Sequence, residues 1–251
     1  MSIAVSGRSL GVRYGARRVF DEVDLELPAG QLVVIVGPNG SGKSSLLRVL
    51  AGIQKPSTGA VQRSASTLLI GSQSAPPPDV TPRDLAGYGL ALRRPWYRLA
   101  ASREEDDAVE AALARTGLTD RARDALGEMS AGEVQRAWIA AALATKVGAL
   151  LVDEPTSHLD LRYQIDVLKT LRALAADGVA VAAAVHDLSL AARFGDIVCV
   201  LAGGTMIVGP PEKVLTAEIL SNAYDVEVSV HRHPEWGFLL CTPSSEIRSR
   251  S

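Results

Sequence analysis

The stretch that most constrains the fold is the glycine-rich loop GPNGSGKS, residues 37–44. The apolar run LVVIV precedes it, and SSLLRVL follows with apolar residues at helical spacing. Glycine has no Cβ, so backbone amides in such a loop can approach an anion closely. Those amides form a concave anion site, to which the helix N-terminus adds its positive end. The pattern predicts a buried strand, a tight loop and a helix that together hold a nucleoside triphosphate.

The side chains of this loop match that chemistry. Lys43 supplies a full positive charge to the β- and γ-phosphates, and Ser44 offers a hydroxyl to Mg²⁺. A chance glycine-rich turn is the alternative, and the strand before the loop and the helix after it disfavour it. The candidate nucleotide-binding residues of the loop are Gly37, Pro38, Asn39, Gly40, Ser41, Gly42, Lys43, Ser44 and Ser45.

A second apolar run, ALLV, ends in two acids, Asp153 and Glu154. In open α/β sheets the carboxyl ends of the strands face the ligand crevice. Asp153 is therefore a candidate ligand of Mg²⁺ through water, and Glu154 a candidate general base for an attacking water. Adjacent acids alone more often mark a solvated turn. Beside a phosphate loop they favour a catalytic site.

Composition limits the classes of function. The chain has 251 residues, 47% of them hydrophobic and 22% charged, with a formal net charge of −2. No bulk charge attracts nucleic acid, so we expect no nucleic-acid partner. No apolar run is long enough to span a bilayer, and MSIAVSGRSL does not read as a secretory signal. Cys199 and Cys241 read as small core residues, which is consistent with the cytosol.

Hydrophobic patterning divides the chain without breaking it into separate domains. Residues 1–30 alternate as antiparallel strands do, and residues 129–251 alternate apolar strand runs with helical segments. Between them, a stretch that opens APPPDVTPRD and continues as a polar helical run predicts a helical insert at about 76–128. We therefore expect one α/β domain over 1–251, with a mainly parallel sheet, an antiparallel β lobe and the helical insert.

Nearly the whole chain resembles the nucleotide-binding subunit of an ATP-binding cassette (ABC) transporter, a P-loop NTPase. The motifs that carry the resemblance are, in chain order, Tyr14 in VRYGARRVF, the phosphate loop, Gln73 in LLIGSQ, the signature-like MSAGEVQR at 129–136, SHLD ending at Asp160, and His186 in AAAVHDLS.

The resemblance implies ATP and Mg²⁺ as cofactors and a role for each motif. It implies that Tyr14 stacks on adenine, that Gln73 reaches the metal and senses the γ-phosphate, and that His186 contacts the γ-phosphate. Taken alone, Tyr14 could be an ordinary strand aromatic and His186 a core histidine. The catalytic set so implied is Lys43, Gln73, Glu154 and His186; the metal set is Ser44, Gln73 and Asp153; and the residues of a second copy that bind the same ATP are Ser130, Ala131, Gly132, Glu133 and Asp160.

The signature departs from the family pattern at two positions. Met129 replaces leucine, a volume-conserving change. Ala131 replaces the first glycine of a pair and adds a methyl group. The penalty is small if the φ angle of Ala131 is negative and larger if it is positive. The segment between Gly59 and Gln73 is also short for the family.

The family implies partners as well. We expect a head-to-tail homodimer around two ATP molecules, held on the cytoplasmic face of the membrane by integral permease subunits, with an external solute-binding protein acting indirectly. Leu92–Arg98, with Trp96 and Tyr97, is the expected permease groove, although packing inside the insert explains these aromatics equally well.

The segments QRAWIAAALA and VLTAEILSNAYDVEVSV resemble importers of ferric siderophores, haem and vitamin B12, and the first leans toward ferric siderophores. An importer of another solute, a cassette ATPase outside transport and a non-hydrolysing cassette are the alternatives.

Overall fold

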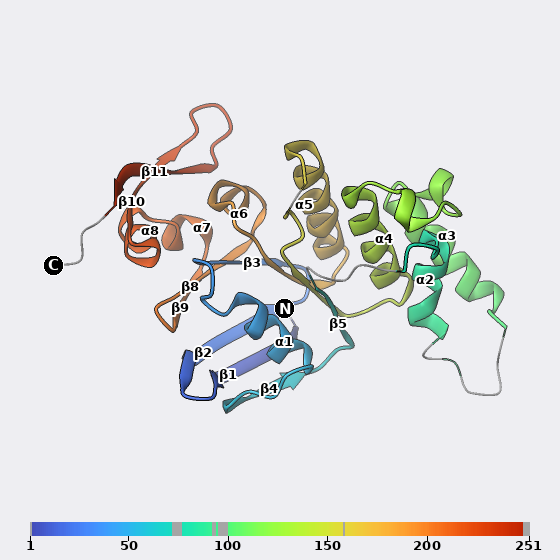
Figure 1. The fold of residues 1–251 in the computed structure, drawn as a ribbon, viewed down its shortest axis with the longest axis horizontal. Helices are drawn as coiled ribbons and strands as arrows, with labels where there is room; N and C mark the ends of the chain where they lie inside the picture. Colours follow the sequence, from blue (N-terminus) through green and yellow to red (C-terminus); the bar gives the residue numbers. More distant parts are fainter. Residues whose placement is uncertain (1, 72–76, 92–93, 95–99, 158, 248–251) are drawn as a thin grey trace. The chain divides into compact units, whose positions relative to one another are not determined.

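The computed structural model describes residues 2–71, 77–91, 94, 100–157 and 159–247. The chain forms two compact units, each described here by itself. The first comprises Met1–Leu69, Gly148–Pro155 and Leu171–Ser251, and the second comprises Ile70–Val147 and Thr156–Thr170. The colours of Figure 1 show that each unit is assembled from segments that are separated in the sequence.

The first unit is built on a six-stranded sheet. Its strand order is β5 (Thr67–Ile70), β6 (Ala149–Asp153), β7 (Ala180–Ala184), β3 (Leu32–Val36), β8 (Ile197–Ala202) and β9 (Thr205–Gly209). β3 pairs in parallel with β7 and β8, and β6 pairs in parallel with β7, while β8 and β9 form an antiparallel hairpin. Every residue of β3, β6 and β7 is buried, which explains their unbroken apolar runs.

An antiparallel sheet of three strands, in the order β2–β1–β4, forms the β lobe. Its strands are β1 (Ile3–Tyr14), β2 (Arg17–Pro28) and β4 (Thr58–Arg63). Inward-facing residues such as Leu10 and Phe20 are fully buried in one core with Leu46 and Leu50 of helix α1 (Lys43–Ala51). The β lobe and the phosphate loop's helix therefore share a single hydrophobic core, which fixes the loop on two sides.

The C-terminal part of the first unit carries three short helices and a hairpin. The helices are α6 (Leu188–Phe194), α7 (Pro211–Val214) and α8 (Ala217–Tyr224), and the hairpin strands are β10 (Val226–Arg232) and β11 (Leu239–Ile247). The Val228 amide donates to the Ser221 hydroxyl at 2.9 Å, and the Cys241 amide donates to the Ser189 hydroxyl at 3.1 Å. These two bonds join the hairpin to α8 and to α6, and Figure 1 shows the ribbons of these elements.

The second unit is helical. Its helices are α2 (Pro82–Ala91), α3 (Arg103–Arg115), α4 (Ala131–Ala144) and the first part of α5 (Leu161–Ala176), with 3₁₀ turns at Thr119–Arg121 and Leu126–Glu128. The core of this unit packs Leu85 of α2 and Leu113 of α3 against an alanine-rich face of α4 that includes Ala137 and Ala140. Small side chains on α4 let the other two helices approach closely.

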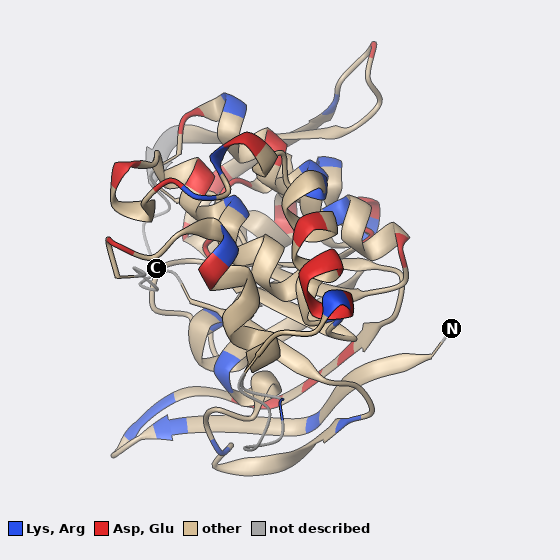
Figure 2. Ribbon diagram, turned by 90° about the vertical axis from the view of Figure 1, so that its right-hand side faces the viewer, with Lys and Arg blue, Asp and Glu red and all other residues tan. Residues whose placement is uncertain are grey.

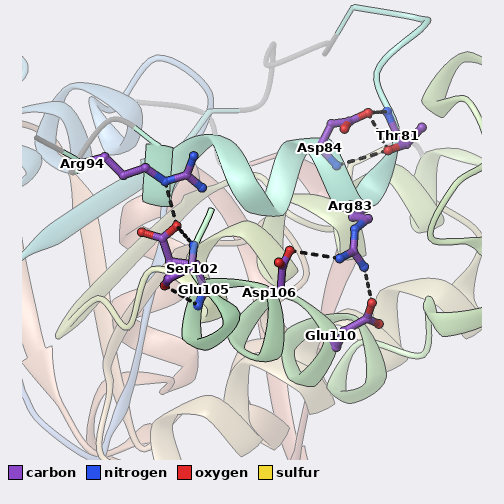
Figure 3. Close-up of polar contacts among 8 residues, drawn as sticks. All are labelled: Thr81, Arg83, Asp84, Arg94, Ser102, Glu105, Asp106 and Glu110. Carbon is purple, nitrogen blue, oxygen red and sulfur yellow. Dashed lines mark hydrogen bonds and ion pairs between the residues drawn. The ribbon is translucent and has the colours of Figure 1, made fainter. Parts of the chain in front are cut away.

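Ion pairs on the surface join α2 to α3 (Figure 3). Arg83 of α2 pairs with Asp106 at 3.1 Å and with Glu110. Arg94 contacts Glu105 at 2.7 Å, and both side chains are less than a fifth exposed, so solvent screens this pair less than most surface pairs. Figure 2 shows that acidic and basic residues are interspersed over the helices on the face it displays.

These findings confirm the expected fold class, a mainly parallel sheet with an antiparallel β lobe and a helical part. The helical unit differs from the expected insert of 76–128, because it also contains α4 and residues 156–170. The alanine-rich pattern of α4 did not reveal that this helix completes the core of α2 and α3. Cys199 is buried as expected, whereas Cys241 is only half-buried.

Candidate nucleotide-binding and catalytic site

The phosphate loop runs from the end of β3 to the first turn of α1, and its glycines are sterically required. A Cβ atom on Gly37 would lie 2.1 Å from the carbonyl oxygen of Leu201. Gly42 has a φ angle of 106°, and a Cβ atom there would lie 2.5 Å from Cγ1 of Val19. Helix α1 begins without a side-chain cap. Its first amides therefore remain available to an anion.

Lys43 is buried within this loop, with 6% of its surface exposed. Its Nζ atom donates to the carbonyl oxygens of Gly37 at 2.7 Å and Pro38 at 3.1 Å. Burial lowers the pKa of Lys43, and the carboxylates of Glu154 and Asp153 act in the opposite direction. The ammonium group is thus already positioned at the loop, where it is bonded to neutral carbonyls. A phosphate oxygen would be a stronger partner and would replace them.

Ser44 and Asp153 meet where a metal ion would be expected. The Ser44 hydroxyl donates to Oδ1 of Asp153 at 3.1 Å. Asp153 is 5% exposed, and burial is the main reason that its pKa is raised. A hydroxyl and a carboxylate are the hard oxygen donors that Mg²⁺ prefers, and positive charge would relieve the buried carboxylate. The two side chains therefore fit Mg²⁺.

Glu154 and His186 face each other across the ends of β6 and β7. Nε2 of His186 lies 2.9 Å from Oε1 of Glu154. Glu154 has a φ angle of 52°, in the left-handed region, and its amide donates to the carbonyl oxygen of Ala184 at 3.1 Å. A glutamate in this backbone conformation is strained, and such strain concentrates at functional sites. The conformation turns the carboxylate out of the strand and toward the histidine.

Lys43, Ser44 and Glu154 line one cavity. This cavity, of about 180 Å³, is also lined by Val19 and by other residues of the phosphate loop. Tyr14 is half exposed, and its hydroxyl lies 3.1 Å from the Ser45 hydroxyl and donates to Oε1 of Gln54 at 3.0 Å. These bonds hold the phenol by its hydroxyl and leave ring surface free to stack on a base.

The signature residues lie at the start of α4 in the second unit. Ser130 caps the helix in a capping box with Glu133, which also contacts Arg121 at 2.9 Å. Contacts with the Ser130 amide lower the pKa of Glu133. Ala131 is the first helical residue and is not among the described residues with positive φ, so its methyl group fits without strain. A Cβ atom on Gly132 would lie 3.0 Å from the Tyr163 ring.

The structure thus brings Tyr14, the phosphate loop, Asp153, Glu154 and His186 together within the first unit. Ser130–Glu133 belong to the second unit, as does the exposed Asp160. The backbone carbonyl of Asp160 accepts a hydrogen bond from the backbone amide of Gln164. Gln73 lies outside the described residues, as do Trp96 and Tyr97. Sequence reasoning missed Tyr224, whose hydroxyl is buried near the Gly37 backbone and which no motif marks.

Comparison with known proteins decides the family. The family model described as ABC transporter matches residues 20–157, more than half of the chain. This chain belongs to the ABC transporter family. As a member of the family, it is an ATP-binding subunit with ATPase activity. In the described part of the chain, no helix is both long and apolar enough to cross a membrane.

Relatives of this ABC transporter subunit match almost its full length. A hemin import ATP-binding protein of Thermobifida fusca is 36% identical, over 96% of this chain and 89% of the relative. The ferric enterobactin transport ATP-binding protein of Escherichia coli is 33% identical, over 94% of this chain and 93% of the relative.

Solved structures agree with this assignment. A chain from the inward-facing structure of a transporter assigned to the metal-chelate type superposes with a TM-score of 0.90 at 26% identity. The match covers 98% of this chain and 99% of that chain. The ADP conformation of an ATP-binding cassette superposes with a TM-score of 0.76 at 20% identity, covering 86% and 95% of the two chains, and shows the shared fold.

Proposed function

We propose that this chain hydrolyses ATP within a head-to-tail homodimer and thereby drives import of an iron complex, with a ferric siderophore as the first candidate, through a membrane permease. The observation that carries the proposal is the arrangement of Lys43, Glu154 and His186. A buried ammonium group in a phosphate loop faces the same cavity as a carboxylate that is bonded to an imidazole. That combination suits phosphoryl transfer to water.

Each residue has a chemical task in this proposal. Lys43 and the loop amides bind and orient the triphosphate. Glu154 orients an attacking water and accepts its proton, and His186 holds the Glu154 carboxylate and reaches the γ-phosphate. Ser44 and Asp153, with Gln73, would hold Mg²⁺, which supplies charge neutralisation on the phosphates when bound. Tyr14 would stack on the adenine.

The placement of the two half-sites in different parts of the chain supports the proposed homodimer. The phosphate loop and the signature residues belong to different compact units of the chain. We assign Ser130, Ala131, Gly132, Glu133 and Asp160 to the ATP that is held by the partner copy. The N-terminus of α4 presents the amides of Ala131 and Gly132, which an anion could use, while the Ser130 amide donates to the Glu133 carboxylate at 2.9 Å. In a dimer with a two-fold axis, each ATP would be bound by the phosphate loop of one copy and the signature of the other.

The family and the relatives support the proposed partners. An import ATP-binding subunit works with a membrane permease, and we place this chain on the cytoplasmic face of the membrane, with a solute-binding protein on the other side. The functions of the relatives, hemin import and ferric enterobactin transport, support an iron complex as the transported solute. The hemin relative favours haem as the second candidate, ahead of vitamin B12.

Calorimetric titration with ATP tests the nucleotide site. We expect the Lys43→Ala variant to lose measurable ATP affinity, because it removes the charge that lies at the loop. The matched control is Lys213→Ala, since Lys213 is exposed on α7. Unchanged ATP affinity in the folded Lys43→Ala protein would refute the assignment of the loop.

Uptake of labelled iron tests the solute. Cells that lack this chain should fail to import a ⁵⁵Fe-labelled siderophore, and expression of the wild-type chain should restore import while Glu154→Gln should not. If haem is the solute, the same cells take up the siderophore normally and fail on haem. Normal uptake of both compounds would contradict the proposal.

A further inference from the structure

Tyr224, the last residue of α8, places a polar group next to the first residue of the phosphate loop. The Tyr224 hydroxyl is buried and makes no hydrogen bond of normal geometry to any residue that the structure describes. The Gly37 backbone lies beside it and favours the ionised phenol, but burial dominates and raises the pKa of Tyr224 to about 12. The hydroxyl therefore keeps its proton at physiological pH, and its oxygen is free to accept a hydrogen bond.

Gly37 is enclosed on its other sides. A Cβ atom built there would lie 2.1 Å from the carbonyl oxygen of Leu201 and 3.0 Å from the Ser41 hydroxyl oxygen. The Ser41 hydroxyl is also buried and lacks a hydrogen-bond partner among the described residues. Lys43 bonds to the carbonyl oxygen of Gly37 at 2.7 Å. Because so little space surrounds Gly37, any movement of its peptide would also move the rest of the loop.

The segment that carries Tyr224 also contacts the catalytic histidine's neighbour. Cys241 of β11 is close to both Tyr224 and Asp187, and the Asp187 carboxylate adds to the effect of burial in raising the pKa of Cys241 to about 11. Asp187 follows His186 directly and caps α6, accepting from the Leu190 amide at 2.8 Å. The C-terminal segment thus has Tyr224 beside Gly37 and Cys241 close to Asp187, the residue after His186.

Binding of a phosphate changes the balance at Gly37. In this structure the Lys43 ammonium is bonded to the carbonyls of Gly37 and Pro38. A bound phosphate attracts that ammonium more strongly than neutral carbonyls do. When Lys43 turns to the phosphate, the Gly37 carbonyl oxygen loses this donor, and Gly37 can instead be held at its amide, beside which the buried Tyr224 oxygen lies. A bond from the Gly37 amide would give the buried Tyr224 oxygen a partner.

We propose that Tyr224 is a positioning residue for the phosphate loop, whose hydroxyl accepts the Gly37 amide hydrogen when the loop holds a nucleotide and thereby fixes the loop in its binding conformation. This inference rests on the proposed nucleotide site. It assigns a role in ATP binding to the C-terminal segment, which lies beyond the residues that the family model matches.

Steady-state kinetics of the full chain test the role. We expect Tyr224→Phe to raise KM for ATP about three- to ten-fold, the effect of losing one hydrogen bond, with kcat changed less than about two-fold. The matched control is Ser221→Ala, which removes another buried hydroxyl of α8 together with its bond to Val228. If Ser221→Ala raises KM equally, general loosening of the segment explains the effect and the proposal is wrong. An unchanged KM in Tyr224→Phe also overturns it.

A second measurement detects the contact without relying on catalysis. Labelling valine carbonyl carbons with ¹³C and glycine nitrogens with ¹⁵N selects the Val–Gly pairs, which in this sequence end at Gly37, Gly148 and Gly209. The variants Val147→Ala and Val208→Ala remove the other two signals and so assign Gly37. We expect Tyr224→Phe to move the Gly37 amide signal, and the difference from wild type to grow when ATP is added.

The two measurements separate the two ideas. If the wild-type chain fails to bind ATP, the proposed function is wrong, and the Gly37 signal of the nucleotide-free protein still decides whether Tyr224 contacts the loop. If the wild-type chain binds ATP and the Gly37 signal is identical in wild type and Tyr224→Phe, the positioning role is refuted and the proposed function is untouched.

Discussion

Nε2 of His186 lies 2.9 Å from Oε1 of Glu154, so the residues that follow two neighbouring parallel strands form one polar pair. The pair depends on the left-handed backbone of Glu154, which directs the carboxylate toward β7 and away from its own strand. A base held by a second group keeps a fixed direction toward the water it activates. This geometry leads to the first prediction.

Glu154→Gln should reduce ATP hydrolysis by about 10²- to 10⁴-fold, the usual contribution of a general base. The glutamine has nearly the same shape, so ATP affinity should change little. Phosphate release and calorimetric ATP binding, measured on the same preparation, check the two parts. Hydrolysis at the wild-type rate by Glu154→Gln would mean that another group activates the water.

Asp153 should make the nucleotide-free protein less stable at neutral pH. Burial raises its pKa in the folded state, so the folded protein holds this proton more tightly than the unfolded chain does. The stabilisation is therefore present at low pH and is lost as pH rises through the raised pKa. Asp153→Asn removes the buried charge, and at pH 7 it should raise Tm by about 2–4 °C, as a stabilisation of about 1 kcal/mol would.

Thermal melts between pH 4 and pH 7 check this expectation. The difference in Tm between Asp153→Asn and wild type should shrink as the pH falls, because the wild-type carboxyl group becomes protonated. Ser44→Ala is a useful companion, since its hydroxyl is the hydrogen-bond donor to Asp153. A gap in Tm that widens toward low pH would contradict the sign of the argument.

Tyr14 should contribute to nucleotide affinity through its ring. Tyr14→Ala should weaken ATP binding by about ten-fold or more, because stacking of a base on an aromatic ring contributes about 1–3 kcal/mol. Tyr14→Phe keeps the ring and loses the contacts to Ser45 and Gln54, so it should bind ATP nearly as well as wild type. Fluorescence titration with a labelled ATP distinguishes the two variants. Equal affinity of Tyr14→Ala and wild type would identify Tyr14 as an ordinary strand aromatic.

Ala131 should be compatible with full activity. It begins α4 in a backbone conformation that alanine adopts without strain, and its amide remains in place. Ala131→Gly should therefore change the ATPase rate by less than about two-fold while destabilising α4 by up to about 1 kcal/mol. Phosphate release and a thermal melt measure both effects. A large gain in rate for Ala131→Gly would show that the methyl group obstructs the signature.

Much of this site could be predicted from sequence because its residues are fixed by local rules. The phosphate loop requires glycines and a lysine at set spacing, and Asp153 and Glu154 follow a buried strand that ends at the ligand edge of the sheet. The role of His186 was predicted from the resemblance to the family. The structure places Lys43, Glu154 and His186 in one unit, where Lys43 and Glu154 line one cavity and His186 contacts Glu154.

Other features depend on contacts between distant segments, which no local pattern records. The assignment of α4 to the helical unit follows from its packing on α2 and α3, and the left-handed backbone of Glu154 leaves no trace in composition. Tyr224 reaches Gly37 across nearly 190 positions of sequence. Its position in TAEILSNAYDVEV resembles that of any aromatic near a helix end.

The central claim is that one copy of the chain grips ATP while the signature of a second copy binds the same γ-phosphate. Static light scattering of Glu154→Gln tests it most directly, because this variant should bind ATP without consuming it. With ATP, the account predicts a species of twice the 26.4 kDa mass of one chain, and a return to that single mass when ADP replaces ATP or when Lys43 is also changed to alanine. A folded Glu154→Gln protein that binds ATP and stays at the single mass would contradict it.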